Sequence, residues 1–416
     1  MIVQEKGTVD MITVAENIFL GREKQFMKGG LFHAGAMNKA AKKLLESLGL
    51  GAINPRMNVT WLNAETRKLV EIARVMYTKP DVLIIDETTT ALSQNGRELI
   101  YGLMKAQVAE NKAVIFITHD LDELVELCTD ITVLRDGVFI DSMKKEDTDI
   151  RALRNMMVGR EFDDNYYRSD TDGSCSDELA LTLEHVTDSY MIEDFSLELH
   201  KGEILGIAGL SEGGMHEIGR IAYGITPTLT GRVYNHLTGT EIRDCATAKK
   251  SGIGYISKNR DAESVILNAS IRDNIMMTSY RKVENGPFIP ASAERKFANK
   301  EADKLNLKRR DIDQIVDELS GGNKQKVVFA KWMGNESDIY IMDCPTRGID
   351  IGVKASMYQL MYDLKKQGKA ILLISEELTE VIGMADRIMI VKDGKVTGQV
   401  RREEAPSEHD LINYII

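Results

Sequence analysis

The chain has 416 residues, of which 43% are hydrophobic and 28% charged, which is typical of globular domains. Its length fits two or three domains of the usual size. The formal net charge of −11 argues against a nucleic-acid partner, because proteins that bind nucleic acid carry a basic face. No apolar run approaches the roughly 20 residues of a membrane-spanning helix, and the first ten residues do not resemble an export signal.

Strands and helices are predicted to alternate along the chain. In the first part, a turn and helix over residues 60–76 precede a buried strand at 81–85. A helix at 96–108 and a second strand at 113–117 follow. In the second part the predicted elements are a strand at 203–208, a turn and helix at 316–333, a strand at 338–342, a helix at 354–366 and a strand at 370–374. Strand, helix and strand at this spacing predict an α/β fold with a parallel sheet.

The chain contains an internal repeat. Asp86 corresponds to Asp343, a shift of 343 − 86 = 257 positions, and the same shift carries His119 onto Glu376. It also carries Asn17-Ile18 onto Asn274-Ile275, so one shift holds from residue 17 to residue 137. A duplicated domain explains this constant register, whereas chance matches of short motifs would not keep it.

The repeat divides the chain into two domains. We expect a first domain at 1–160, an exposed acidic linker at 161–177 and a second domain at 178–416. The first copy is the shorter by something like 80 residues at its front. The four scattered cysteines, Cys128, Cys175, Cys245 and Cys344, contain no CxxC pair and are expected to be reduced thiols.

Three polar residues follow the two strands of the first domain. Asp86 and Glu87 come after one strand and His119 after the next, so all three are expected to face one crevice. An Asp there can hold Mg²⁺ on a triphosphate, a Glu can polarise an attacking water, and a His can contact the terminal phosphate. The alternative is a strand that ends in solvated acids, with His119 a surface residue.

A second motif is Ser320-Gly321-Gly322 in the second domain. Ser320 can cap a helix over residues 323–333, and the glycines let backbone N–H groups approach an anion. The alternative is an ordinary helix cap after a turn. The position of the motif, shortly before Asp343, favours the anion site.

This ordered set resembles the nucleotide-binding domains of ABC transporters: an LSGG signature, a Walker B strand and then the switch histidine. The tandem arrangement resembles the ATP-binding subunit of bacterial monosaccharide importers of the ribose, galactoside and xylose types. The segments around Asn17 (TVAENIFLGRE) and Arg347 (CPTRGIDIG) are similar to segments of that subfamily. The resemblance implies tandem P-loop NTPase-like cassettes, each a parallel-sheet core with a helical subdomain.

The resemblance also implies roles for residues. Gln4 matches the Q-loop glutamine that touches Mg²⁺, Asp86 the Walker B aspartate, Glu87 the catalytic base and His119 the switch. Residues 91–93 lie where the D-loop does, and Ser320, Gly321 and Gly322 match the signature. The implied cofactors are ATP and Mg²⁺. The implied partners are transmembrane permease subunits and an extracytoplasmic sugar-binding protein, with this chain at the cytoplasmic face of the bacterial plasma membrane.

Both copies depart from the family pattern. The first has no phosphate-binding loop, which leads us to expect an N-terminally truncated gene product. The second has a candidate loop, but Met215 stands at the lysine position, His216 at the Ser/Thr position, and Glu212 replaces a glycine. The residues of this degenerate loop are Gly209, Gly213, Gly214, Met215 and His216. A carboxylate near phosphates repels them by a few kcal/mol, an order-of-magnitude value at intermediate dielectric.

The remaining residues of the second copy are also altered. Cys344 replaces the catalytic Glu beside Asp343, and Glu376 replaces the switch histidine. The first copy's signature, Asn63-Ala64-Glu65, has lost both glycines. Because ABC domains pair head to tail, we expect one working composite site, with the Asp86 set and the Ser320 signature, and one degraded site.

Three functions therefore remain open. The first is the ATP-hydrolysing subunit of a sugar importer, although this chain alone is expected to be weakly active or inactive. The second is a truncated, non-hydrolysing relic or regulatory subunit. The third, a tandem ABC protein that acts on ribosomes, is disfavoured by the short acidic linker and the net charge of −11.

Overall fold

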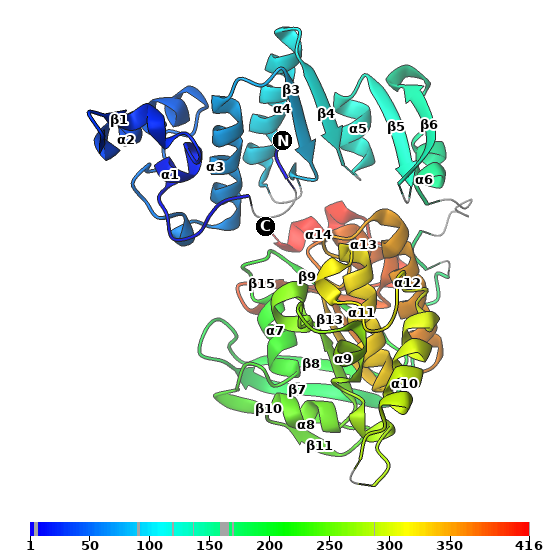
Figure 1. Cartoon of the computed structure of the whole chain (residues 1–416). Helices are drawn as coiled ribbons and strands as arrows, with labels where there is room; N and C mark the ends of the chain where they lie inside the picture. Colours follow the sequence, from blue (N-terminus) through cyan, green and yellow to red (C-terminus); the bar gives the residue numbers. More distant parts are fainter. Residues whose placement is uncertain are drawn as a thin grey trace. The chain divides into compact units, whose positions relative to one another are not determined.

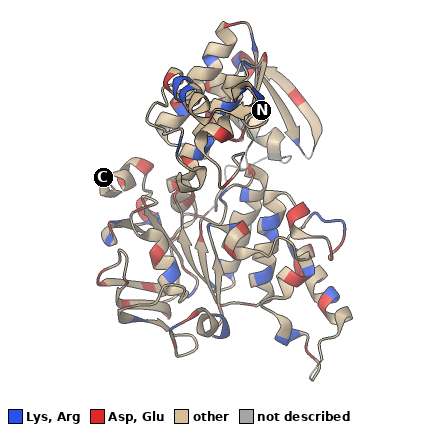
Figure 2. Cartoon of the chain, turned by 60° about the vertical axis from the view of Figure 1, so that its left-hand side comes forward, with Lys and Arg blue, Asp and Glu red and all other residues tan. Residues whose placement is uncertain are grey.

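The computed structural model describes residues 1–3, 7–89, 92–118, 120–135, 137–158, 166–168, 170–286 and 288–415. The chain forms two compact units, Met1–Arg160 and Glu161–Ile416, and each is described by itself (Figure 1). In the view of Figure 2, acidic and basic residues are interspersed along both units. Among the described residues, no helix is long and apolar enough to cross a membrane.

The first unit contains small separate sheets. Strands β3 (Val82–Asp86) and β4 (Ala113–Ile117) pair in parallel, and β5 (Asp130–Arg135) pairs antiparallel with β6 (Val138–Lys144). A short hairpin joins β1 (Met27–Lys28) to β2 (Leu31–Phe32). The helices are α1 (Val14–Ile18), α2 (Ala34–Ser47), α3 (Ala64–Tyr77), α4 (Gln94–Ala109), α5 (Leu121–Leu127) and α6 (Ile150–Val158).

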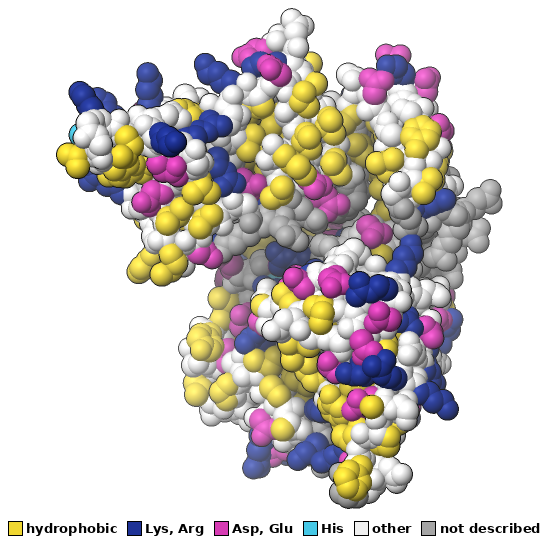
Figure 3. Space-filling model, viewed as in Figure 1, with side chains coloured by type: hydrophobic (Ala, Val, Ile, Leu, Met, Phe, Trp, Pro, Cys, Tyr) yellow, Lys and Arg dark blue, Asp and Glu magenta, His cyan; other side chains and the backbone are white. Residues whose placement is uncertain are grey.

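Among the described residues of the first unit, the buried apolar side chains form three clusters rather than one. One cluster joins α1, α2 and α3, a second surrounds β3, and a third lies between β5 and α6. Other hydrophobic side chains stay at the surface, and Figure 3 shows a group of them over β3 and β4. The parallel β3–β4 pair therefore has only part of the cover that such a pair requires.

The second unit is built on a six-stranded sheet with the order β12-β13-β14-β9-β15-β16. All pairs are parallel except β15–β16. The strands are β12 (Ile253–Ile256), β13 (Ile339–Asp343), β14 (Ala370–Ile374), β9 (Ile204–Gly209), β15 (Arg387–Lys392) and β16 (Lys395–Arg401). The continuous apolar runs of β13, β14 and β9 suit strands buried on both faces.

A second sheet and a set of helices complete this unit. The antiparallel sheet has the order β11-β10-β7-β8, with β7 (Leu179–Thr187), β8 (Phe195–His200), β10 (Thr230–Asn235) and β11 (Thr240–Ile242). The helices are α7 (Met215–Ala222), α8 (Cys245–Lys250), α9 (Ile271–Met276), α10 (Ala291–Lys304), α11 (Gly321–Gly334), α12 (Ile351–Lys366), α13 (Leu378–Met384) and α14 (Glu408–Ile415). In Figure 1 the green strands β7, β8 and β10 lie on the side opposite α10 and α12.

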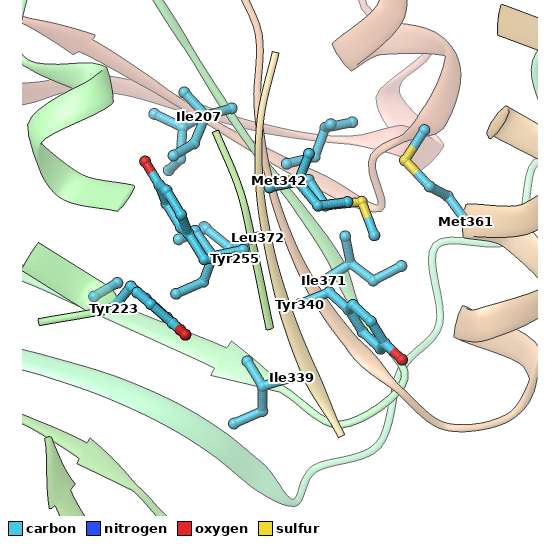
Figure 4. Packing of buried hydrophobic residues seen from close by; sticks show 14 of the residues in the cluster. Ile207, Tyr223, Tyr255, Ile339, Tyr340, Met342, Met361, Ile371 and Leu372 are labelled. Atoms are coloured by element: carbon cyan, nitrogen blue, oxygen red, sulfur yellow. The ribbon is translucent and has the colours of Figure 1, made fainter. Parts of the chain in front are cut away.

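One continuous apolar cluster fills the second unit. Figure 4 shows residues of the parallel sheet, such as Ile339 and Leu372, with the aromatic rings of Tyr223 and Tyr255 beside them. Those two rings stack with centroids 5.1 Å apart. A single well-packed core of this size gives the second unit far more buried apolar area than each small cluster of the first.

The repeat holds element by element. β3 begins at Val82 and β13 at Ile339, a shift of 339 − 82 = 257, and the same shift carries α2 onto α10, α3 onto α11 and α4 onto α12. It also carries β4, α5, β5 and β6 onto β14, α13, β15 and β16. The prediction of tandem α/β domains with parallel sheets is confirmed. The element bounds differ from the sequence prediction mainly at helix starts, since α4 and α12 begin a few residues early.

The predicted linker is not wholly exposed. Arg168 is buried at 5% exposure, and its guanidinium donates to the Asp386 carboxylate over 2.5 Å and to Asp170 over 2.6 Å. Tyr166 and Tyr167 lie against Tyr358 of α12. The expectation of an exposed segment is therefore wrong here, because aromatic and arginine side chains anchor it to the second unit.

Candidate nucleotide sites

Asp86 and Glu87 lie at the C-terminal end of β3. Asp86 pairs with Ile117 of β4, and the Glu87 N–H donates to the Ile117 carbonyl oxygen over 2.9 Å. Glu87 has a φ of 41°, in the left-handed region that such residues rarely adopt and that often marks a functional site. Both carboxylates stand at the strand end, as expected. His119 and Gln4, the other predicted members of this site, lie outside the described residues, as does Ala91 of the predicted D-loop.

The electrostatics of this carboxylate pair suit a divalent cation. Burial raises the pKa of Asp86 above its usual 3.8, and the negative charge of Glu87 raises it further. A bound cation would offset both effects, because it favours the charged form of each carboxylate. Carboxylate oxygens are also the protein ligands that Mg²⁺ prefers. The donor set therefore fits Mg²⁺ carried by a nucleotide.

A buried acid behind this pair was not anticipated from the sequence. Glu123 of α5 accepts hydrogen bonds from the Thr89 hydroxyl at 2.8 Å and the Thr118 hydroxyl at 3.3 Å. In the second unit Glu380 accepts from the Thr346 hydroxyl at 2.6 Å. These contacts tie the segment after β3 to α5, and the segment after β13 to α13. The shift of 257 carries Thr89 onto Thr346 and Glu123 onto Glu380. A search of the repeat for matching polar residues could therefore have identified both pairs.

The candidate loop of the second unit joins β9 to α7. A Cβ on Gly209 would lie 2.3 Å from the Val391 carbonyl oxygen, and one on Gly213 would lie 3.1 Å from the Leu210 oxygen. Gly214 has a φ of 96° and is the N-cap of α7. Close packing and backbone conformation therefore require these glycines, and the loop keeps the tight turn of a phosphate-binding loop.

The two side chains after the glycines point into the protein. Met215, at the position predicted for lysine, is fully buried in the core. His216 is buried as well, with its Nδ1 2.7 Å from Asp343 Oδ1 and its Nε2 3.2 Å from Glu376 Oε1. Three residues predicted for the degraded site are thus brought together, with an imidazole between two carboxylates.

The hydrogen bonds of His216 shift the pKa values of the site. Burial lowers the pKa of His216, but hydrogen bonds to Asp343 and Glu376 outweigh it, so the pKa lies above 6.5. The hydrogen bond from His216 lowers the pKa of Glu376 to about 2. An imidazolium between two carboxylates supplies the positive charge that a divalent cation would otherwise bring. These residues therefore do not fit Mg²⁺ bound to a nucleotide.

Cys344 stands where the first unit has Glu87. It shares the left-handed backbone, with a φ of 47°, and its N–H donates to the Ile374 carbonyl oxygen over 2.8 Å. Burial raises the pKa of the thiol, and the neighbouring Asp343 raises it further. A protonated, buried thiol cannot take a proton from water, so this position lacks a base.

The intact signature forms the start of α11. A Cβ on Gly321 would lie 3.2 Å from the Gly348 carbonyl oxygen, and one on Gly322 would lie 2.9 Å from Val353 Cγ2. Ser320 is the N-cap residue of α11, at the predicted position, but within the described part of the chain its side chain makes no capping hydrogen bond to the helix. The first N–H groups of the helix keep their capacity to bind an anion.

The altered signature of the first unit behaves differently. The Asn63 side chain accepts from the Thr66 N–H over 2.8 Å and caps α3. Glu65 Oε1 accepts from the Ser93 N–H over 3.1 Å. The helix start thus satisfies its own N–H group and carries a negative charge, which makes it a poor site for phosphate.

Comparisons with known proteins agree with this geometry. Residues 192–347 match the model of the ABC transporter family. A putative ribose/galactose/methyl galactoside import ATP-binding protein of Halalkalibacterium halodurans is 35% identical over 408 residues, which cover 98% of this chain and 77% of the relative. The ribose import ATP-binding protein RbsA of Clostridium perfringens is 35% identical over 410 residues, covering 98% of this chain and 81% of the relative. This chain belongs to the family of ABC-transporter ATP-binding proteins of sugar import.

A solved structure is similar to part of this chain. The ATP-binding cassette of an ABC transporter in its ADP conformation has a TM-score of 0.48 and 20% identity, and it covers 57% of this chain and 98% of that chain. The predicted resemblance to the sugar-import ABC subfamily is confirmed by the relatives. ATP is the nucleotide that the family binds.

Proposed function

We propose that this chain is the ATP-binding subunit that powers uptake of a simple sugar through a membrane permease. The names of its relatives include ribose, galactose and methyl galactoside import. One observation supports an ATPase above all. The first unit keeps Asp86 and Glu87 at the end of β3, whereas in the second unit Asp343 is bonded to His216 and Cys344 stands in place of the base.

The first unit supplies the chemistry in this proposal. Asp86 and Gln4 hold Mg²⁺, Glu87 polarises the attacking water, and His119 contacts the terminal phosphate. The roles of Gln4 and His119 rest on the resemblance alone. The N–H groups at the start of α11 bind nucleotide phosphate through Ser320, Gly321 and Gly322, although the pairing of this signature with the first unit's carboxylates remains a prediction.

The second unit has a supporting role. The glycines of its loop preserve the turn, but Met215 offers no cation and His216 occupies the carboxylates Asp343 and Glu376. With Cys344 in place of a base, this unit does not hydrolyse ATP. It contributes the signature and stabilises the subunit.

The proposed role in sugar uptake also implies protein partners. We propose docking on permease subunits at the cytoplasmic face of the membrane, with sugar delivered by an extracytoplasmic binding protein. Two exposed apolar residues of the first unit, Met11 at 79% and Trp61 at 83%, offer a contact surface. The Met11 N–H donates to the Thr60 hydroxyl, which places the two segments together. The shift of 257 gives Asn268 and Glu318 at the matching positions, so this apolar pair belongs to the first unit alone.

ATP hydrolysis by the complex tests the proposal. The chain is reconstituted with its permease in proteoliposomes, and phosphate release is measured for the wild type, Glu87→Gln and Cys344→Ser. Loss of the base should lower the rate by about 100-fold or more, whereas Cys344→Ser, the matched change in the second unit, should leave it within about twofold. An inactive wild-type complex, or a Glu87→Gln complex at the wild-type rate, would contradict it.

A further inference from the structure

Three side chains with different metal-binding atoms meet in the second unit. The ligand atoms of His216, Asp343 and Cys344 all lie within 4.8 Å of one another. His216 belongs to the first turn of α7, Asp343 ends β13, and Cys344 follows β13 directly. All three residues are buried, at 3%, 2% and 7% exposure. Buried ionisable groups of this kind are paired with one another or hold a metal ion, so the cluster is a candidate metal site.

The three donors are an imidazole nitrogen, a carboxylate oxygen and a sulfur, which is a set that Zn²⁺ binds in a tetrahedral arrangement. Mg²⁺ prefers oxygen ligands alone, whereas thiolate and imidazole select a softer ion. Zn–N and Zn–O bonds of about 2.0 Å set tetrahedral ligand atoms roughly 3.3 Å apart. His216 Nδ1 and Asp343 Oδ1 are 2.7 Å apart, so a small widening of this pair would seat the ion between them.

A fourth residue, Glu376, fixes the direction of the imidazole. Its Oε1 lies 3.2 Å from His216 Nε2 and accepts a hydrogen bond from the Ser211 hydroxyl over 2.8 Å. Histidines that bind a metal through one nitrogen almost always donate the other N–H to a carboxylate, a carbonyl or a water. With the Nε2 proton directed at Glu376, the lone pair of Nδ1 faces Asp343. The Glu376 side chain is 34% exposed, which gives an ion a route from solvent.

We propose that His216, Asp343 and Cys344 bind a Zn²⁺ ion, with Glu376 as the positioning carboxylate behind the imidazole. A water molecule completes the tetrahedron. The bound ion ties the first turn of α7 to the end of β13. The ion takes no part in ATP hydrolysis, and the site does not depend on the proposed ATPase role, so the test of one proposal does not decide the other.

The exchange of protons for the ion leaves the charge of the cluster unchanged. When His216 is protonated and Cys344 keeps its proton, the metal-free site holds an imidazolium, a carboxylate and a thiol. On binding, the Nδ1 proton of His216 and the thiol proton leave to solvent, and bonds form from Zn²⁺ to nitrogen, oxygen and sulfur. The two positive charges of the ion then offset one carboxylate and one thiolate. The net charge of the three residues is zero in both states, so binding adds no uncompensated charge to the protein interior.

The described residues include another group of this kind, formed by Cys175, His200 and Glu203. Its surroundings do not favour a cation. Arg387 Nε donates to Glu203 over 2.9 Å, so a guanidinium already pairs with the carboxylate. Cys175 is exposed, unlike Cys344. This group therefore serves as a comparison within the same chain, and the test must distinguish binding at the two places.

Metal binding by the full chain tests the proposal. An untagged chain with Cys128→Ser, Cys175→Ser and Cys245→Ser keeps Cys344 as its only thiol, since the sequence has four cysteines. Co²⁺ is the spectroscopic probe. One equivalent should give a near-ultraviolet charge-transfer band from sulfur to cobalt and the visible bands of a four-coordinate ion. Zn²⁺ should then displace Co²⁺ with a Kd below about 1 μM, whereas about a thousandfold excess of Mg²⁺ should leave both sets of bands unchanged.

Matched variants separate the ligands from other residues. In the same background, Cys344→Ser should remove the charge-transfer band, and both Cys344→Ser and His216→Gln should weaken Zn²⁺ binding by about 100-fold or more. Glu376→Gln should keep the band and weaken binding about tenfold, as expected for a positioning residue. His409→Gln, at an exposed position, should bind like its parent. No band at one equivalent, or a folded Cys344→Ser chain with the parent's affinity for Zn²⁺, would overturn the proposal.

Discussion

His216 carries the electrostatic difference between the two sites. In the second unit its ring nitrogens lie 2.7 Å from Asp343 and 3.2 Å from Glu376, whereas the first unit leaves Asp86 and Glu87 beside each other at the strand end. When His216 is protonated, this internal cation removes the repulsion that a metal ion would otherwise have to offset. The second site is therefore stable without a ligand, at the cost of its nucleotide chemistry.

The stability of the second unit should depend on pH through this histidine. Because the folded-state pKa of His216 lies above 6.5, its contribution is complete below pH 6.5 and is lost as the pH rises through the folded value. The pKa of Glu376 falls from 4.5 to about 2, so its contribution is complete above pH 4.5 and is lost as the pH falls toward 2. Maximum stabilisation by the pair thus lies between pH 4.5 and 6.5.

His216→Gln tests this dependence. At pH 6 the variant should lower the free energy of unfolding of the second unit by about 1–3 kcal/mol, because a buried charged hydrogen bond is lost. The difference from the wild type should shrink as the pH rises. Urea unfolding over a pH series measures it, with the exposed His409→Gln as control. A constant difference across the series would contradict the assignment.

At the scale of elements, α3 and α11 are repeats with different starts. Asn63 caps α3 through the Thr66 N–H, and Ser320 leaves the start of α11 without a side-chain cap among the described residues. A capped helix start is more stable, and an uncapped one is better able to bind phosphate. The two helices have the same length, but the start of α3 favours helix stability and the start of α11 favours anion binding.

Alanine substitution should separate the two helices. Asn63→Ala should destabilise α3 by about 1 kcal/mol, because a capping bond is lost, whereas Ser320→Ala should cost less than about 0.5 kcal/mol. Hydrogen exchange of amides in the first turn of each helix measures both effects, and the Thr66 amide should respond most. Similar losses in α3 and α11 would show that Ser320 caps its helix after all.

At the scale of the whole molecule, the two units differ in how they bury apolar surface. The second unit has one continuous core that includes β9, whereas the described residues of the first unit form three smaller clusters. Smaller cores give lower opening free energies, because fewer contacts must break together.

Limited proteolysis should therefore remove the first unit first. We expect a fragment that retains the anchored Arg168 and extends to the C-terminal region to outlast any fragment of the first unit by about tenfold. Mass spectrometry of a digestion series identifies the fragments. Arg168→Ala, which leaves Asp386 without this buried partner, should shorten the life of the surviving fragment, and early loss of the second unit in the wild type would refute the expectation.

Much of this molecule could be predicted from the sequence. The shift of 257, seen first in short motifs such as those at Asp86 and Asp343, places the repeated helices and strands of both units in register. Apolar runs of strand length gave β3, β4, β13 and β14, because buried parallel strands need such runs. Residue identities alone also distinguished the two strand ends, because Glu87 follows β3 and Cys344 follows β13.

The tertiary structure decided the rest, because contacts between distant residues leave no local pattern. The sequence could name His216 as an unsuitable loop residue, but only the fold brings it between Asp343 and Glu376, 127 and 160 positions away. The sequence showed an acidic segment after residue 160, but only the fold showed that Arg168 of this segment is buried against Asp386. The repeat matches β4 and β5 to β14 and β15, but only the fold shows that β9 lies between the latter two strands and pairs in parallel with both.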